Sequence, residues 1–192
     1  MPASRRQMLA RLSLAAAAAS FARPASAQMQ MSRPTAYAFS FTGLDGSAIR
    51  LAEHAGKPIL IVNTASQCGF TPQYAGLQEL WMRYRERGLL VLGVPSNDFG
   101  GQEPGGSVDI GHTAHAHGVT FPIAAKANVR GADPHPFYKW AASERPLDAP
   151  RWNFHKYLVG RDGRIAGSFP AAVTPTDARL VAAIEQQLAV SR

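Results

Sequence analysis

The sequence predicts an α/β fold in which a mixed sheet is covered by helices on both faces. Two continuous apolar runs, residues 58–64 and 89–95, are typical of strands buried on both faces, and a helical segment separates them. Strand, helix and strand in this order form a right-handed parallel crossover. Further along, residues 154–159 and 164–169 flank a glycine-bounded turn, which predicts an antiparallel hairpin beside the parallel pair.

The first elements follow from turn and helix signals. Residues 38–42 and 48–51 flank the turn Leu44-Asp45-Gly46, so we expect a short N-terminal β-hairpin. Between the two apolar runs, Thr71 is expected to cap a helix whose first residue is Pro72, and Gly88 to end it. Its apolar positions recur at helical spacing: Tyr74, Leu77, Trp81 and Tyr84.

The later elements complete a thioredoxin-like pattern. Residues 119–125 are a short strand candidate, and residues 135–142 a short helix. Thr174 is expected to cap a last helix over residues 175–189. One face of that helix is apolar, with Leu180, Ile184 and Leu188. A parallel crossover, an antiparallel hairpin and a final helix together predict the thioredoxin-like fold.

The N-terminus is typical of an export signal. It has the pair Arg5-Arg6, an apolar run over residues 12–21, and the small-residue cleavage site Ala25-Ser26-Ala27. The arginine pair indicates a twin-arginine signal over residues 1–27, the alternatives being an ordinary secretory signal or a basic arm. We therefore expect a periplasmic protein with a flexible leader over residues 28–37 and a single domain over residues 38–192. No later apolar run reaches the roughly 20 residues of a membrane span.

Four of the seven net positive charges of the chain lie in this predicted signal. The formal charge of +7 includes four arginines of the first 27 residues, where there is no acid, so the rest of the chain carries +3. That value is ordinary for a soluble domain and includes no basic run of the kind that binds polyanions. We expect no nucleic-acid partner and no stable membrane insertion.

Cys68 is the only cysteine of the 192 residues. In an exported protein a lone thiol is buried and inert, paired with another molecule, or chemically employed. Cys68 follows the first buried strand at its carboxyl end, where α/β sheets place their sites, and precedes a helix N-terminus. Partial positive charge and free N–H groups at that end favour a thiolate, so the location predicts a reactive thiol.

Five segments in the same order resemble the glutathione peroxidase family. They are NTASQCGFTPQYAGLQEL, VLGVPSNDFGGQEPG, GVTFPI, HPFYKW and WNFHKYLVGRDGRI, within a resemblance that spans residues 39–188. The resemblance implies that Cys68 attacks a hydroperoxide, giving an alcohol or water and a sulfenic acid. It also assigns Gln102, Trp152 and Asn153 to the site, as uncharged donors that hold the thiolate and assist proton transfer.

The sequence departs from the family pattern where many members carry a second, resolving cysteine. Ala114 occupies that position, Ser96 replaces another common cysteine, and Asp98 stands where glutamine is usual. We therefore expect an external thiol, glutathione or a thioredoxin-like reductant, to resolve the sulfenic acid. The short segments after Lys126 and before Trp152 resemble the monomeric, phospholipid-hydroperoxide type. They predict a monomer that accepts hydrogen peroxide and organic or lipid hydroperoxides.

Two other classes of function stay open. A thiol-disulfide exchange protein on the same fold needs a partner cysteine near Cys68, and the sequence offers none. A non-catalytic peroxide sensor would be oxidised once and signal to a partner. We expect no cofactor and no metal, because the histidines of HTAHAH, residues 112–117, do not share one helix face.

Overall fold

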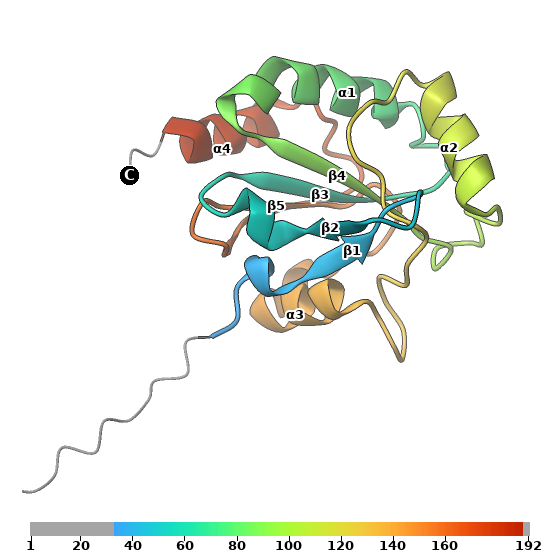
Figure 1. Cartoon of the computed structure of the whole chain (residues 1–192), viewed down its shortest axis with the longest axis horizontal. Coiled ribbons are helices and arrows are strands. Elements are labelled where there is room, and N and C mark those ends of the chain that lie inside the picture. The colour runs from blue at the N-terminus through green and yellow to red at the C-terminus, as the bar shows by residue number, and fades with distance from the viewer. Residues whose placement is uncertain (1–32, 190–192) are drawn as a thin grey trace, which may run out of the picture. The chain divides into compact units, whose positions relative to one another are not determined.

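A four-stranded mixed sheet forms the centre of the computed structural model, which describes residues 33–189 (Figure 1). Its strands are β3 (Ile59–Thr64), β4 (Leu90–Pro95), β5 (Lys156–Val159) and β6 (Ile165–Phe169). The order across the sheet is β4-β3-β5-β6. The β3–β4 pair is parallel, whereas β5 is antiparallel to both β3 and β6. The predicted crossover and hairpin are therefore confirmed.

Helices cover both faces of this sheet (Figure 1). They are α1 (Gln73–Tyr84), α2 (Ser107–Ala116), α3 (Pro136–Glu144) and α4 (Ala178–Ala189). Strand residues alternate between two cores: Leu60 and Val62 pack with Leu77 of α1 and Leu180 of α4, whereas Ile61 packs with the residues of α3. The N-terminal hairpin, β1 (Ser40–Thr42) and β2 (Ala48–Arg50), is antiparallel as predicted and joins the α3 side.

Both predicted helix caps are wrong, because each helix begins later. The helix α1 begins at Gln73, and the hydroxyl of Thr71 bonds with backbone groups of the preceding loop instead of capping. The helix α4 begins at Ala178. There the carboxylate of Asp177, and not the hydroxyl of Thr174, accepts a hydrogen bond from the N–H of Arg179 at 2.9 Å.

Two further expectations are corrected at the edges of the fold. Residues 119–125 form no strand, since only Ile123 and Ala124 make isolated bridges, to Gly93 and Gly43. Residues 33–37, which the sequence predicts to be a leader, pack onto the domain: Ala36 has no exposed surface, and the carbonyl of Pro34 accepts a hydrogen bond from the Trp140 indole.

The predicted export signal and most of the leader lie outside the described residues, so their assignment stays a prediction. The described part of the chain contains no helix that combines the length and the apolar character of a membrane span.

Candidate active site

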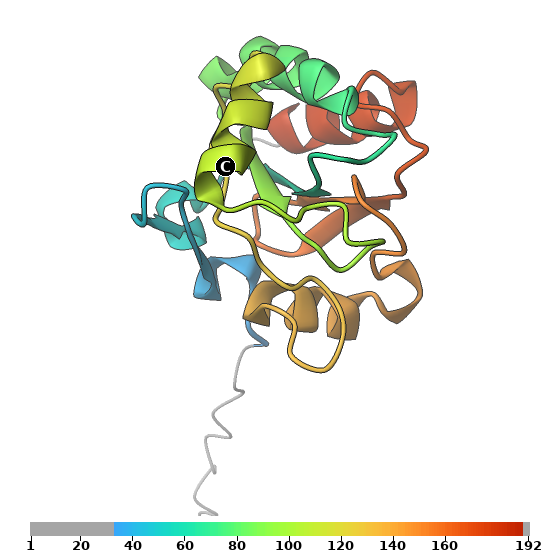
Figure 2. The same cartoon turned by 90° about the vertical axis from the view of Figure 1, so that its right-hand side faces the viewer.

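Three loops meet where β3 and β4 end, and together they carry the four predicted site residues. Figure 2 faces this end of the molecule. The N–H of Gln67, which precedes Cys68, donates to the carbonyl of Gln102 at 3.0 Å. The amide of Asn63 at the end of β3 donates to the carbonyl of Trp152 at 3.1 Å. Segments that are far apart in the sequence are therefore joined around the cysteine loop.

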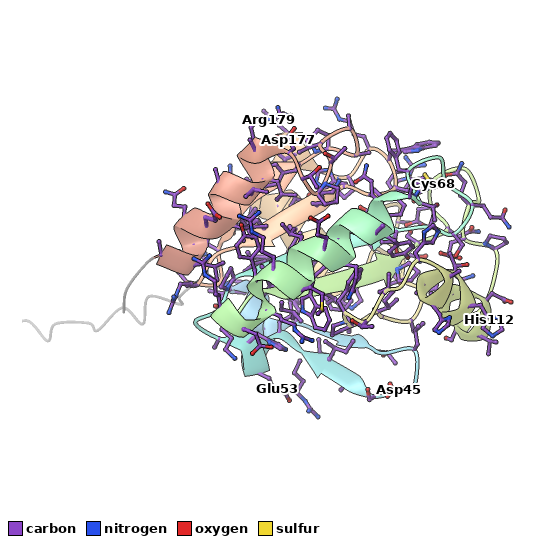
Figure 3. All side chains as sticks on the ribbon, turned by 90° about the horizontal axis from the view of Figure 1, so that it is seen from above. Asp45, Glu53, Cys68, His112, Asp177 and Arg179 are labelled. Atoms are coloured by element: carbon purple, nitrogen blue, oxygen red, sulfur yellow. The ribbon has the colours of Figure 1, made fainter. Side chains whose placement is uncertain are left out.

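Cys68 lies beyond the N-terminal end of α1 (Figure 3). The hydroxyl of Thr71 fixes its loop, accepting from the N–H of Cys68 at 3.1 Å and donating to the carbonyl of Ala65 at 2.9 Å. The N–H of Phe70 points at the sulfur, with a nitrogen-to-Sγ distance of 3.4 Å. Such a donor stabilises negative charge on sulfur. Only 7% of the surface of Cys68 is exposed.

Two side-chain amides form a directed pair beside this loop. Asn153, which has no exposed surface, donates from Nδ2 to Gln102 Oε1 at 2.9 Å and to the carbonyl of Phe99 at 3.4 Å. Both amide hydrogens of Asn153 are thereby used. The bond also fixes the orientation of the Gln102 amide, and no acceptor among the described residues takes a hydrogen bond from its Nε2. Gln102 is therefore the member of the pair that retains free donors.

Trp152 lies at the rim of the site, with 41% of its surface exposed. Its ring packs against Phe99, with centroids 6.0 Å apart. Gly100 and Gly101 bring the loop past this ring with φ values of 67° and 65°, a left-handed conformation that favours glycine. An added Cβ at Gly100 would lie 3.6 Å from both Gln102 and Trp152, so both side chains lie close to this turn.

A cavity of about 450 Å³ opens beside Trp152 and Phe70. Trp152 is the one predicted site residue that lines it, and Cys68 does not. Its other apolar walls come from Leu147, Ala149, Pro170, Ala171 and Ala172. A volume of this order accommodates a small organic molecule. Another cavity, of about 500 Å³, lies between the β1–β2 turn and α2 and includes none of the four predicted site residues, so we do not connect it with Cys68.

The histidines of residues 112–117 lie on and just after α2. His117 packs against the ring of Tyr74, with centroids 5.7 Å apart. Across residues 33–189, no group of three or more histidine, cysteine, aspartate or glutamate side chains is arranged to hold a metal ion.

Comparison with known proteins decides the family. The family model described as glutathione peroxidase matches residues 36–142. This chain belongs to the glutathione peroxidase family. A glutathione peroxidase-like peroxiredoxin of Chlamydomonas reinhardtii is 44% identical over 162 residues, covering 82% of this chain and 99% of the relative. A hydroperoxy fatty acid reductase of Synechocystis is also 44% identical, covering 80% and 96%. Membership makes the chain an oxidoreductase of the peroxidase class.

Solved structures agree with this assignment. The crystal structure of Trgpx in apo form is 32% identical with a TM-score of 0.66, and it covers 81% of this chain and 97% of its own. The structure of T. cruzi GPX1 is 28% identical with a TM-score of 0.65, covering 83% and 99%. A thioredoxin-family interchange protein of Chlorobium tepidum, 15% identical with a TM-score of 0.57, shares the fold alone. The thioredoxin-like fold is therefore confirmed.

The three departures from the family pattern have structural roles of their own. Asp98 accepts hydrogen bonds from the N–H groups of Val129 and Arg130 at 2.6 and 3.1 Å. Ser96 is fully buried, and its hydroxyl accepts from the N–H of Asp98 at 3.3 Å. Ala114 is a buried residue of α2. These contacts explain how the substituted positions are filled, and Cys68 remains a free thiol.

Sequence reasoning missed two residues that fix the cysteine loop, Thr71 and Glu103, and it also passed over the buried Lys156. The Glu103 carboxylate accepts from both the N–H and the hydroxyl of Ser66, two residues before Cys68, and burial raises its pKa. A signal existed for Lys156, because it is a charged residue within an apolar strand. No comparable signal marked Thr71, whose hydroxyl serves equally well as a helix cap.

Proposed function

We propose that this chain reduces hydrogen peroxide and organic or lipid hydroperoxides at Cys68, using an external thiol as the reductant. One observation supports this most directly. The cysteine loop at the N-terminal end of α1 is joined to the Gln102 loop, and Gln102 in turn to Asn153. The arrangement combines one thiol with oriented, uncharged donors, which is what cleavage of an O–O bond requires.

In the oxidative half of the cycle, the thiolate of Cys68 attacks the terminal oxygen of the hydroperoxide. A sulfur–oxygen bond forms as the O–O bond breaks, and the departing alkoxide takes a proton to become an alcohol, or water from hydrogen peroxide. Cys68 becomes a sulfenic acid. We assign Gln102 and the indole N–H of Trp152 as donors to the developing charge, and Asn153 as the residue that orients Gln102.

In the reductive half, a first external thiol attacks the sulfenic sulfur, releasing water and forming a mixed disulfide. A second thiol then attacks this disulfide, restoring Cys68 and leaving an oxidised external disulfide. Because Cys68 is the only cysteine, the chain contains no thiol of its own for this step. Glutathione and a thioredoxin-like protein are the two reductants to compare.

The cavity beside Trp152 and Phe70 supports organic hydroperoxides as substrates. Its walls are mainly apolar and suit a hydrocarbon group. Two Synechocystis relatives, 44% and 41% identical, are named hydroperoxy fatty acid reductases. We therefore propose lipid hydroperoxides as substrates beside hydrogen peroxide, with no cofactor.

Turnover distinguishes an enzyme from a peroxide sensor. With excess thiol, we expect the chain to consume many equivalents of hydroperoxide, also in the presence of a metal chelator. Cys68→Ser should abolish this consumption. Consumption that stops after about one equivalent per Cys68 would favour the sensor. Consumption that Cys68→Ser leaves intact would exclude Cys68 as the nucleophile.

We further propose export to the periplasm as a monomer. Mass spectrometry of the protein from a periplasmic fraction should find Gln28 as its first residue. Replacing the pair as Arg5→Lys and Arg6→Lys should retain the precursor in the cytoplasm, because twin-arginine receptors read that pair. Unchanged export of this double variant would favour an ordinary secretory signal. Gel filtration of the exported form tests the monomer.

A further inference from the structure

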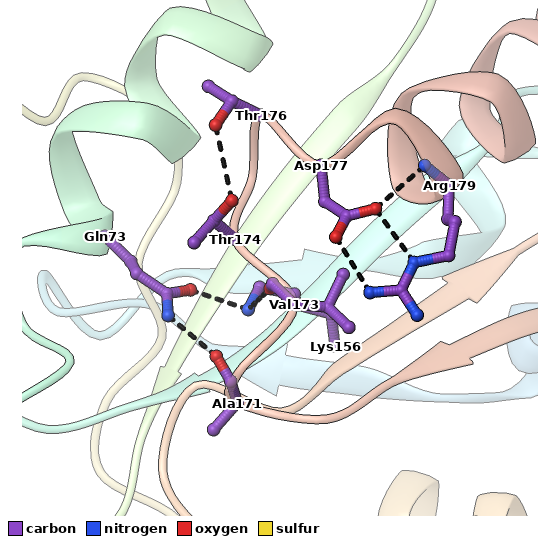
Figure 4. A network of polar contacts seen from close by, with 8 residues as sticks. All are labelled: Gln73, Lys156, Ala171, Val173, Thr174, Thr176, Asp177 and Arg179. Atoms are coloured by element: carbon purple, nitrogen blue, oxygen red, sulfur yellow. Dashed lines mark hydrogen bonds and ion pairs between the residues drawn. The ribbon is translucent and has the colours of Figure 1, made fainter.

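Lys156 on β5 has no exposed surface, yet its side chain ends in an ionisable amine. Its Nζ donates to three neutral oxygens: Gln73 Oε1 at 2.6 Å, the carbonyl of Val173 at 2.6 Å and the carbonyl of Phe154 at 2.9 Å. Figure 4 shows the contacts with Gln73 and Val173. Within the described part of the chain, no carboxylate forms an ion pair with it. A buried charge without a counter-ion is costly, so its presence requires a cause.

The register of β5 directs Lys156 toward the start of α1. Lys156 shares a face of the strand with Leu158, which belongs to the core beneath α1 and α4. Gln73 is the first residue of α1 and lies five positions after Cys68. Its Nε2 donates to the carbonyl of Ala171, a wall of the cavity beside Trp152, at 2.7 Å. Lys156 therefore connects Gln73, at the start of α1, with Val173, in the segment before α4.

The third acceptor, Phe154, has a strained backbone. Its φ of 63° is the only positive φ of a non-glycine residue among residues 33–189. A bulky residue adopts this left-handed conformation only where its surroundings enforce it, and such strain clusters at functional sites. The N–H of Phe154 donates to the carbonyl of Asn63, and its buried ring packs edge-on against Tyr74, with centroids 5.4 Å apart. Phe154 directly follows Trp152 and Asn153.

We propose that Lys156 is a positioning residue whose ammonium holds the left-handed Phe154, and thereby Trp152 and Asn153, against the cysteine loop. The inference rests on the proposed peroxidase function. Charge matters because an ammonium has three hydrogens for its three acceptors, whereas a neutral amine has two. Deprotonation of Lys156 therefore releases one of the three contacts, and peroxide reduction slows.

The pH at which this happens falls in an accessible range. Burial lowers the pKa of Lys156 to about 7, and its three acceptors work in the opposite direction. The titratable groups around it keep their charge state between about pH 5 and 9. His155 is neutral there because burial and the charge of Lys156 lower its pKa to about 4, burial raises the pKa of Tyr74, and Asp177, before α4, stays ionised beside Arg179.

The first test removes the charge at nearly constant side-chain length. Lys156→Met should slow the reaction of Cys68 with hydrogen peroxide about tenfold to a hundredfold, as expected for misplaced site groups. The matched control, Lys139→Met on the exposed side of α3, should react at the wild-type rate. Single-turnover rates at 25 °C are compared in the full chain, beside thermal unfolding curves. A wild-type rate in Lys156→Met would overturn the proposal, whereas an unreactive wild type would overturn the peroxidase function instead.

The second test uses pH and does not require the Lys156 variant to fold. Gln73→Glu gives the ammonium a carboxylate partner, which favours its charged form. The decline in rate at alkaline pH should therefore move upward by about one pH unit. Gln73→Met, which adds no charge, should not move it upward. A wild-type profile without an alkaline decline, or a decline that Gln73→Glu leaves in place, contradicts the positioning role.

Discussion

The amide of Asn153 has no hydrogen left for a ligand, because Gln102 and the Phe99 carbonyl take both. We therefore propose that Asn153 acts on catalysis through Gln102. The resemblance to the family identified both residues, but it assigned them the same role. The direction of the hydrogen bond between them distinguishes the two proposed roles. Gln102 keeps its N–H groups for the reacting atoms, and Asn153 orients Gln102.

This order of action predicts non-additive effects. Gln102→Ala and Asn153→Ala should each slow the peroxide step, by about a hundredfold for the loss of one oriented donor. The double variant should be hardly slower than Gln102→Ala alone, since the two side chains act as one unit. Stopped-flow measurement of the sulfenic acid would show this. Asn128→Ala, on an exposed loop, is the control, and independent effects that multiply would contradict the coupling.

The loop between β4 and α2 depends on two glycines in left-handed conformation. At Gly101, with φ of 65°, an added Cβ would meet no atom within 4 Å, so any cost of alanine there is backbone strain. Gly111 lies inside α2, where an added Cβ meets only Leu44, at 3.9 Å. Alanine at position 101 therefore tests backbone strain, whereas alanine at position 111 tests helix propensity.

We expect opposite changes in stability from the same substitution. Gly101→Ala should lower the free energy of unfolding by roughly 1–2 kcal/mol and slow peroxide reduction by displacing Gln102. Gly111→Ala should raise the free energy of unfolding by about 0.5–1 kcal/mol, because alanine favours the helix and restricts the unfolded chain. Urea denaturation of both variants measures this. Equal stability of Gly101→Ala and the wild type would contradict the strain.

Apolar periodicity predicted β3, β4, α1 and α4, but it did not single out α2, which contributes Ile110 and Ala114 to one core. It was also not enough for residues 119–125, which make only isolated bridges, one of them to Gly93 within the edge strand β4. The starts of α1 and α4 were also missed, because a hydroxyl can form hydrogen bonds with several different backbone groups equally well. Thr71 bonds within the cysteine loop, and which acceptor it takes depends on how that loop folds back.

Across the whole molecule, the site is assembled from segments about 35 and 50 residues apart, centred on Cys68, Gln102 and Asn153. Matching motifs predicted that these residues belong together, and the structure joins their loops by hydrogen bonds. The buried connection through Lys156 was not predicted. It depends on which strand face meets α1, and sequence alone does not specify this.

Acid sensitivity is a second property of the folded molecule. Burial, followed by the charge of Lys156, lowers the pKa of His155 to about 4, below its ordinary value of 6.5. Between these values the unfolded chain binds a proton that the folded chain excludes. The stabilisation is therefore complete above about pH 6.5 and is lost as the pH falls toward 4, on the order of 3 kcal/mol.

Thermal unfolding from pH 8 to 4 tests this sign. The midpoint of the wild type should fall more steeply below pH 6.5 than that of His155→Gln, which keeps a side chain able to accept a hydrogen bond from Ser168 but does not titrate. Parallel curves for the two proteins would show that other groups account for the acid sensitivity.

Because little of Cys68 is exposed, access to its sulfur differs between the two half-reactions of the proposed cycle, whose reactants differ in size. A hydroperoxide group is only two oxygens long, so we expect it to reach the sulfur more readily than a folded protein partner does. A thioredoxin-like reductant, one of the two proposed, must align its own sulfur with the same atom, and we expect the loop holding Cys68 to open for it. With such a reductant, we expect regeneration to limit turnover at high peroxide, so that the enzyme accumulates in the oxidised form, where one more equivalent of peroxide overoxidises Cys68.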